Sequence, residues 1–90
     1  MSGCEKLLKE LIGELKGAGI NRIRYEVGVE GWREILVNDG KEVTNWNLQD
    51  KIDLVISLMH YLKIIPYPEE EGEVSKFEYE GISFEYVFWC

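Results

Sequence analysis

One histidine, two cysteines and a run of glutamates are the residues of this 90-residue chain that could carry chemistry. His60 could act as a general base or as a metal ligand, but the sequence offers no second histidine and no H-E-x-x-H context. Cys4 and Cys90 lie near opposite ends and form no C-x-x-C motif, and their spacing leaves both a bridged and a free state open. We therefore predict that the protein is not an enzyme and holds no metal or cofactor.

The acidic residues are distributed unevenly along the chain. The sequence has 17 acidic and 10 basic residues, a net charge of −7. Residues 1–63 are nearly balanced, whereas residues 64–90 carry seven glutamates and a single base, Lys76. A negative surface of this kind suits docking on a basic partner, because complementary potentials speed encounter and set orientation. The alternative interpretation of these glutamates is a solvated loop followed by the solvent-exposed face of a hairpin.

Charge and hydropathy also exclude several classes of protein. A net negative chain lacks the basic footprint that nucleic-acid binding requires, so we expect no direct contact with nucleic acid. Arg22, Arg24 and Arg33 are expected on the outer face of two strands, paired there with neighbouring glutamates. No apolar run approaches the roughly 20 residues of a membrane span, so no membrane contact is expected. Charge at Glu5 and Lys6 comes too early for a secretory signal, which favours a cytoplasmic location.

Two amphipathic segments predict helices. Residues 3–17 carry leucine and isoleucine at helical spacing and are followed by Gly19, which favours a helix end. A second helix is predicted from Asn47 to Ile65, where Pro66 stops it. This helix is apolar on two faces and has only a narrow polar stripe. It is therefore expected either to lie between the sheet and the first helix or to be covered by a second subunit.

Alternating apolar and polar residues predict five strands joined by three hairpin turns. The first turn, at 30–32, is expected to set Val27 opposite Ile35, because this register keeps one apolar face. The second turn, at 38–40, is expected to set Ile35 opposite Val43. The third, at 80–81, sets Phe77 opposite Phe84.

The predicted elements follow one another as α-β-β-β-α-β-β. We predict one domain spanning residues 1–90, of the α+β class, with an antiparallel sheet and two helices packed on one of its faces.

The segment from the first helix to the second resembles two known families. Residues 3–63 look like double-stranded RNA-binding domains in the order of their elements, but Lys51 is the only base near the start of the second helix, where such domains contact RNA. The segments 35–40, 42–43 and 52–62 are similar to a family of small acidic phage anti-CRISPR proteins. That resemblance implies acidic residues that occupy the nucleic-acid-reading surface of a nuclease, with Asp39 and Glu42 in this role.

The resulting hypothesis is a non-enzymatic, protein-binding regulator or inhibitor that uses an acidic surface, with nucleic-acid mimicry against a basic partner as one form of it. A nucleic-acid-binding protein is one such partner. The alternative is a self-associating structural or adaptor subunit, a homodimer formed through residues 52–65 or through the C-terminal hairpin. The predicted partner-binding residues are Glu69, Glu70, Glu71, Glu73, Glu78, Glu80, Glu85, Asp39 and Glu42.

Overall fold

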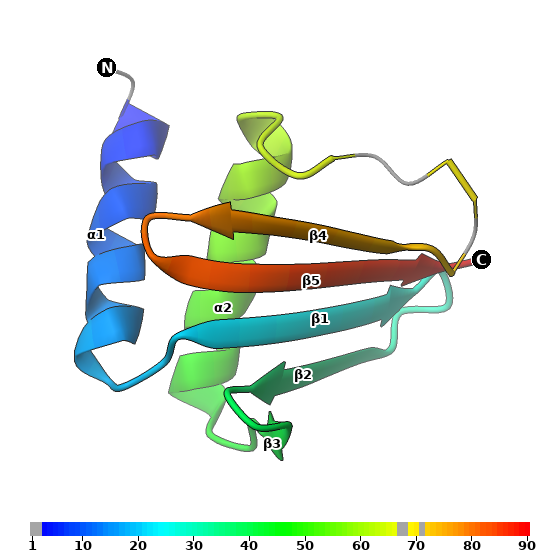
Figure 1. Ribbon diagram of the computed structural model, residues 1–90, viewed down its shortest axis with the longest axis horizontal. Coiled ribbons are helices and arrows are strands. Elements are labelled where there is room, and N and C mark those ends of the chain that lie inside the picture. Colours follow the sequence, from blue (N-terminus) through cyan, green and yellow to red (C-terminus); the bar gives the residue numbers. More distant parts are fainter. Residues whose placement is uncertain (1–2, 67–68, 71) are drawn as a thin grey trace.

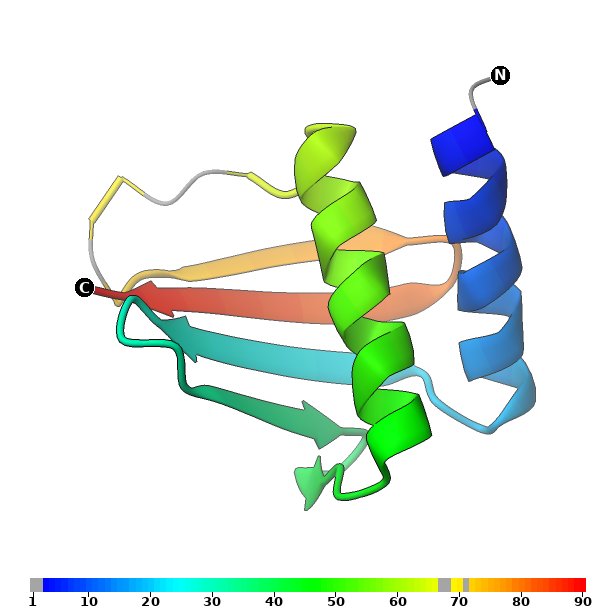
Figure 2. The same ribbon diagram turned by 180° about the vertical axis from the view of Figure 1, so that it is seen from behind.

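The computed structural model describes residues 3–66, 69–70 and 72–90, which form a five-stranded sheet with two helices on one of its faces (Figure 1; Figure 2). The α+β class is therefore confirmed. The elements are α1 (Gly3–Gly17), β1 (Arg22–Gly28), β2 (Arg33–Val37), β3 (Lys41–Glu42), α2 (Trp46–Tyr61), β4 (Val74–Tyr79) and β5 (Ile82–Trp89).

The sheet is mixed, so the prediction of an antiparallel sheet was wrong. Its strand order is β3-β2-β1-β5-β4, and β1 and β5 run parallel while the other neighbours are antiparallel. The order of strands in space thus differs from their order along the chain. A parallel pair needs a long crossover connection, and α2 provides it by crossing one face of the sheet between β3 and the β4–β5 hairpin (Figure 2).

Strand β5 lies inside the sheet, where it is buried on the helix-covered face and partly buried on the open face. Ile82 and Phe84 are buried beneath the helices, and Val87, on the opposite face, is also fully buried. Strand β4 instead exposes Lys76 and Glu78 to solvent. These charges suit an edge strand, where they discourage pairing with further strands.

The turn between β4 and β5 has the predicted residues and register. Phe77 lies opposite Phe84, and their rings stack with centroids 5.2 Å apart. Glu80 and Gly81 have φ angles of 48° and 86°, and positive values at both turn residues match the right-handed twist of the flanking strands.

The turn between β2 and β3 is also confirmed. Residues 38–40 form the connection, and the Val43 N–H donates a hydrogen bond to the Ile35 carbonyl at 3.0 Å. The Asn38 side chain holds the turn to the segment before β1, because its Oδ1 accepts from the Asn21 N–H at 2.9 Å.

The turn between β1 and β2 lies one residue earlier than predicted. The loop is 29–31, and the Gly28 N–H donates to the Trp32 carbonyl at 3.0 Å. Ile35 consequently lies opposite Tyr25, two residues from its predicted partner. The physical reason is the last loop residue, Gly31, which has a φ of 104° and closes the turn in a conformation that other residues rarely adopt.

Helix α2 begins at Trp46, directly after its N-cap, which is Asn45 and lies two residues before the predicted cap Asn47. The Asn45 backbone is extended, and its side-chain oxygen accepts from the Leu48 N–H at 3.0 Å. Both asparagines carry the oxygen that a cap needs, but the extended backbone occurs at the first of them.

Helix α2 also ends earlier than predicted. The Ile64 N–H donates to the Met59 carbonyl at 2.8 Å, and Lys63 has a φ of 58°. This arrangement is a Schellman motif, which satisfies the last carbonyls of the helix. The helix therefore stops at Tyr61 through its own C-terminal motif, before Pro66 is reached.

The inner side of α2 belongs to the hydrophobic core, and an ion pair between Lys51 and Glu14, at 3.0 Å, joins it to α1. Part of its predicted apolar surface stays outside, however, since Leu54 and Tyr61 are exposed. The fully buried residues of α2 are Ile52, Val55 and Met59.

A polar contact beneath α2 ties the helix to β1 and β2. The Tyr25 hydroxyl donates to Asp53 Oδ1 at 2.9 Å, and Arg33 Nε lies 3.0 Å from the same oxygen. Burial, together with the bond to Asp53, raises the pKa of the Tyr25 hydroxyl well above its usual value. Arg33 thus lies on the helix-covered face, which corrects its predicted place on the outer face beside Arg22 and Arg24.

Candidate functional site

The predicted acidic residues do not form one continuous surface. Glu85 lies on the open face of the sheet, the face opposite the helices, where Arg22 and Arg24 each bind one of its carboxylate oxygens at 3.3 Å. Glu80 lies in the β4–β5 turn and pairs with Lys9 of α1 at 3.8 Å. Each of these two carboxylates is therefore neutralised by a neighbouring base.

Three further predicted residues lie on the two opposite edges of the sheet. Asp39 and Glu42 belong to the β2–β3 turn and to β3, at one edge, whereas Glu78 belongs to β4, at the other. Three strands separate these edges, so the residues implied by the anti-CRISPR resemblance do not join those of the C-terminal third.

The remaining predicted glutamates gather at the end of the sheet where β1 and β5 terminate. Glu69, Glu70 and Glu73 precede β4, and the Glu73 carboxylate accepts from the backbone N–H groups of Glu69 at 3.0 Å and Glu70 at 3.2 Å. Glu73 thus organises this short segment. Glu71, the other member of the run, lies outside the described residues.

The β1–β2 loop reaches the same end of the sheet (Figure 1). The Val29 N–H donates to the Trp89 carbonyl at 2.9 Å, and the Gly72 N–H donates to the Phe88 carbonyl at 3.2 Å. Both loops are therefore anchored to consecutive residues of β5, and Glu30 joins the other glutamates there. We call the exposed carboxylates of this end the acidic rim; its members are Glu30, Glu69, Glu70 and Glu73.

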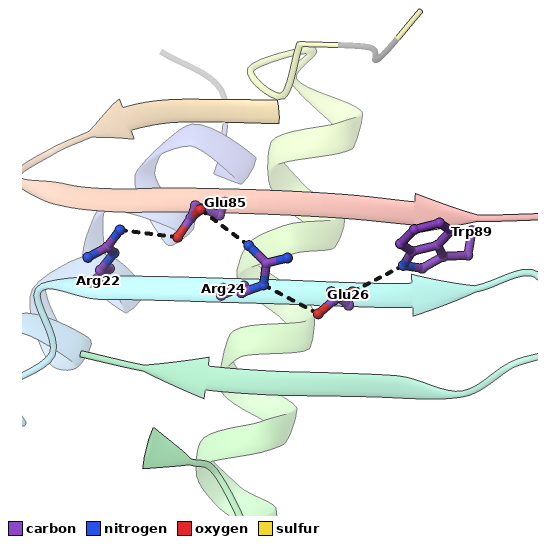
Figure 3. A network of polar contacts seen from close by, with 5 residues as sticks. All are labelled: Arg22, Arg24, Glu26, Glu85 and Trp89. Carbon is purple, nitrogen blue, oxygen red and sulfur yellow. Dashed lines mark hydrogen bonds and ion pairs between the residues drawn. The ribbon is translucent and has the colours of Figure 1, made fainter. Parts of the chain in front are cut away.

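A chain of polar contacts runs along the open face towards this end (Figure 3). Glu85 joins Arg22 to Arg24, and Arg24 Nε lies 3.3 Å from Glu26 Oε2. The other oxygen of Glu26 accepts from the Trp89 indole N–H at 3.0 Å. Glu26 therefore orients the Trp89 ring through the one polar atom that an indole has.

Two glycines make room for two indole rings beside the acidic rim. A Cβ at Gly28 would lie 2.1 Å from the Trp32 ring, and a Cβ at Gly72 would lie 2.5 Å from the Trp89 ring. Gly28 is also the register partner of Trp89, so the Trp32 ring covers the strand position directly beside Trp89. We call Trp32 and Trp89 the aromatic ledge; they are 45% and 39% exposed, so each offers part of its surface to a partner.

The ledge and the rim together form a negative surface with aromatic faces. Among the described residues, none of the ion pairs involves Glu30, Glu69, Glu70 or Glu73. Arg33, the base at the start of β2, is already engaged by Asp53. Indole faces attract cations through their quadrupole, and carboxylates attract them by charge. The arrangement is therefore suited to a cationic group.

His60 lies away from this surface and belongs to the packing between α2 and the sheet. Its ring meets the Tyr86 ring edge-on, with centroids 4.9 Å apart. Burial lowers the pKa of His60 below its ordinary value of 6.5. No three His, Cys, Asp or Glu side chains among residues 3–66, 69–70 and 72–90 are grouped so that they could hold a metal ion.

The lowered pKa of His60 predicts how stability depends on pH. Because the folded state resists protonation, the unfolded chain takes up this proton first, and the stability due to neutral His60 is complete above pH 6.5. It is lost as the pH falls from there through the folded pKa. We expect His60→Gln to lose less unfolding free energy than the wild type between pH 7.5 and 5.5, measured by urea unfolding. Equal losses in the two proteins would contradict this assignment.

Sequence reasoning placed neither tryptophan of the ledge among the predicted partner-binding residues. It missed the part that Gly28, Gly72 and Glu26 play in placing them. One available signal was Gly28, a glycine at an outward-facing strand position, which often marks a close approach of another group.

Comparison with known proteins found no match to this chain among family models, curated proteins or solved structures.

Within the described part of the chain, neither helix combines the length and the apolar character that crossing a bilayer demands. No disulfide joins Cys4 and Cys90 in the described part of the chain.

Proposed function

We propose that this protein is a non-enzymatic binding module that docks a basic segment of a partner protein on the aromatic ledge and acidic rim. The observation that carries the proposal is the seating of Trp32 and Trp89 on glycines, beside carboxylates that no described base neutralises. A protein whose basic surface normally binds nucleic acid is one class of such partner, and occupying that surface would make this chain an inhibitor.

Arginine is the side chain that fits this surface best. Its guanidinium stacks on aromatic faces and donates bidentate hydrogen bonds to carboxylates. A cation over an indole contributes about 0.5–2 kcal/mol, depending on how far it is desolvated. Trp89 is well prepared for this contact, because its bond to Glu26 already holds the ring and less side-chain freedom is lost on binding.

Electrostatic attraction by the rim is expected to set the rate of encounter. Exposed charges act over a screening length of about 10 Å at 0.1 M salt, so the contribution of Glu69 and Glu70 should fall as salt rises. Stacking on the ledge should persist, because it depends on direct contact.

A nona-arginine peptide, titrated by isothermal calorimetry in 0.1 M salt, where exposed charges are screened beyond about 10 Å, tests the proposal. We expect it to bind, and we expect the double variant Glu69→Lys/Glu70→Lys to weaken binding at least about tenfold, which corresponds to about 1.4 kcal/mol. The matched control is Asp39→Lys/Glu42→Lys, which changes the net charge equally but lies at the β3 edge. This control should keep affinity within about threefold, because its charges are more distant than one screening length.

Equal losses in the two double variants would contradict the proposal, because they would show that only net charge matters. Failure of the peptide to bind the wild type at this salt concentration would contradict it as well.

A further inference from the structure

The outward side of α2 carries a stripe of exposed apolar side chains that the proposed function does not use. Trp46 is 81% exposed, Tyr61 is 72% exposed and Leu54, between them, is 42% exposed. Asp50 and Ser57 are exposed as well and fall between them at helical spacing. At about 100° per residue, these five positions lie within roughly a quarter of the helix circumference. We call these five residues the α2 stripe.

The α2 stripe is nearly symmetric about its own midpoint. The midpoint between Trp46 and Tyr61 falls between residues 53 and 54, and the midpoint between Asp50 and Ser57 falls at the same place. In an antiparallel pair of identical helices, each residue faces the position at the same distance on the other side of the midpoint. A two-fold interface requires this kind of self-complementary patch.

We infer that two copies of this chain form a two-fold symmetric dimer in which the α2 helices pack antiparallel along the α2 stripe. Trp46 of one copy lies against Tyr61 of the other at both ends of the interface. Leu54 lies against its own symmetry mate near the axis. The inference is independent of the proposed function, which uses the opposite face of the sheet.

The amount of exposed aromatic surface favours a second copy of this chain as the partner of the α2 stripe. A tryptophan or tyrosine can bury about 150–250 Å² each, and most of that area is still accessible in Trp46 and Tyr61. Counted over two copies, these rings alone provide about half of the roughly 1,000 Å² that a specific interface needs. Leu54 and the stems of the flanking side chains add to that area.

The polar residues of the stripe are compatible with this packing. Asp50 faces Ser57 of the other copy, whose hydroxyl can donate to the carboxylate, so no two like charges of the stripe meet. The antiparallel arrangement also brings the positive N-terminal end of each helix beside the negative C-terminal end of the other.

Cysteine cross-linking tests the register directly, in a Cys4→Ser/Cys90→Ser background. Facing Cα atoms of two packed helices lie within the roughly 4.4–6.8 Å that a disulfide needs. Leu54→Cys should therefore form disulfide-linked dimers rapidly under mild oxidation. Ser57→Cys is the matched control, because it lies on the same stripe but its symmetry mate is about 10 Å away along the axis, at 1.5 Å per residue. A mixture of Asp50→Cys and Ser57→Cys chains should form the heterodimer.

The mass in solution provides the second measurement. Light scattering of the wild type over a concentration series should show a dimer that Leu54→Arg converts to monomer. Val29→Arg, at a more exposed apolar site in the β1–β2 loop, should leave the dimer intact. A monomeric wild type, or cross-linking at Ser57→Cys as fast as at Leu54→Cys, would overturn the inference. Nona-arginine binding should not change in Leu54→Arg. A failure of the dimer inference can therefore be distinguished from a failure of the proposed function.

Discussion

Replacing Gly28 with alanine is expected to expel the Trp32 indole from the open face of the sheet. The new Cβ would lie 2.1 Å from the ring Nε1 and 2.4 Å from Cε2, so the rigid indole cannot stay in place. Half of the aromatic ledge would be lost. We expect the affinity for nona-arginine to fall about tenfold, or about 1.4 kcal/mol. The loss of packed indole surface should lower the unfolding free energy by about 1–2 kcal/mol.

Calorimetry and the wavelength of tryptophan emission measure this effect, since Trp32 moves into water. The matched control is Gly13→Ala in α1, where an added Cβ meets nothing within 4 Å. Alanine is a better helix former than glycine, so this control should raise the unfolding free energy by about 0.5–1 kcal/mol and leave binding unchanged. Unchanged affinity and emission in Gly28→Ala would remove Trp32 from the proposed site.

Replacing Phe84 with alanine is expected to have the largest effect on stability. Phe84 is 2% exposed, stacks on Phe77 of β4 and pairs in register with Ile23 of β1. It therefore lies where the hairpin joins the rest of the sheet. Truncating a buried phenylalanine costs about 3–5 kcal/mol, because apolar burial is lost and a cavity remains. A domain of this length has about 5–13 kcal/mol in total.

Urea unfolding followed by circular dichroism measures this change. Ser83→Ala is the matched control, because Ser83 is exposed on the opposite face of the same strand. It should alter the unfolding free energy by no more than about 0.5 kcal/mol. A loss below about 1 kcal/mol in Phe84→Ala would contradict the central place of this ring in the core.

Local signals predicted the parts of the fold that depend on neighbouring residues. The Glu80-Gly81 turn and its register follow from Gly81, which accepts positive φ, between two alternating strands. Helix α1 ends at Gly17 and is followed by Gly19 with a φ of 84°, as a glycine after an apolar stripe predicts. The ends of α2 were harder to predict from the sequence. Asn45 and Asn47 are equally good caps, and Lys63, an unremarkable residue in the sequence, adopts the conformation that stops the helix.

The candidate site depended on contacts between distant segments, so little of it could be predicted. The excess of glutamate in the C-terminal third was visible, but Glu80 and Glu85 proved to be paired with bases from α1 and β1. Glu26 and Glu30, from the balanced part of the chain, lie beside the ledge instead. A charge balance along the sequence cannot show which carboxylates share a surface.

The sequence alone determined the α+β class, the places of most turns and the main apolar row of most strands, because alternation and helical spacing act within a few residues. The tertiary structure decided that β5 pairs in parallel with β1. That choice depends on how well two remote strands pack together once α2 has crossed the sheet, and no local pattern encodes it. The same pairing brings Trp89 to Glu26 and Glu85 to Arg24, and so it creates the surface on which the proposed function rests.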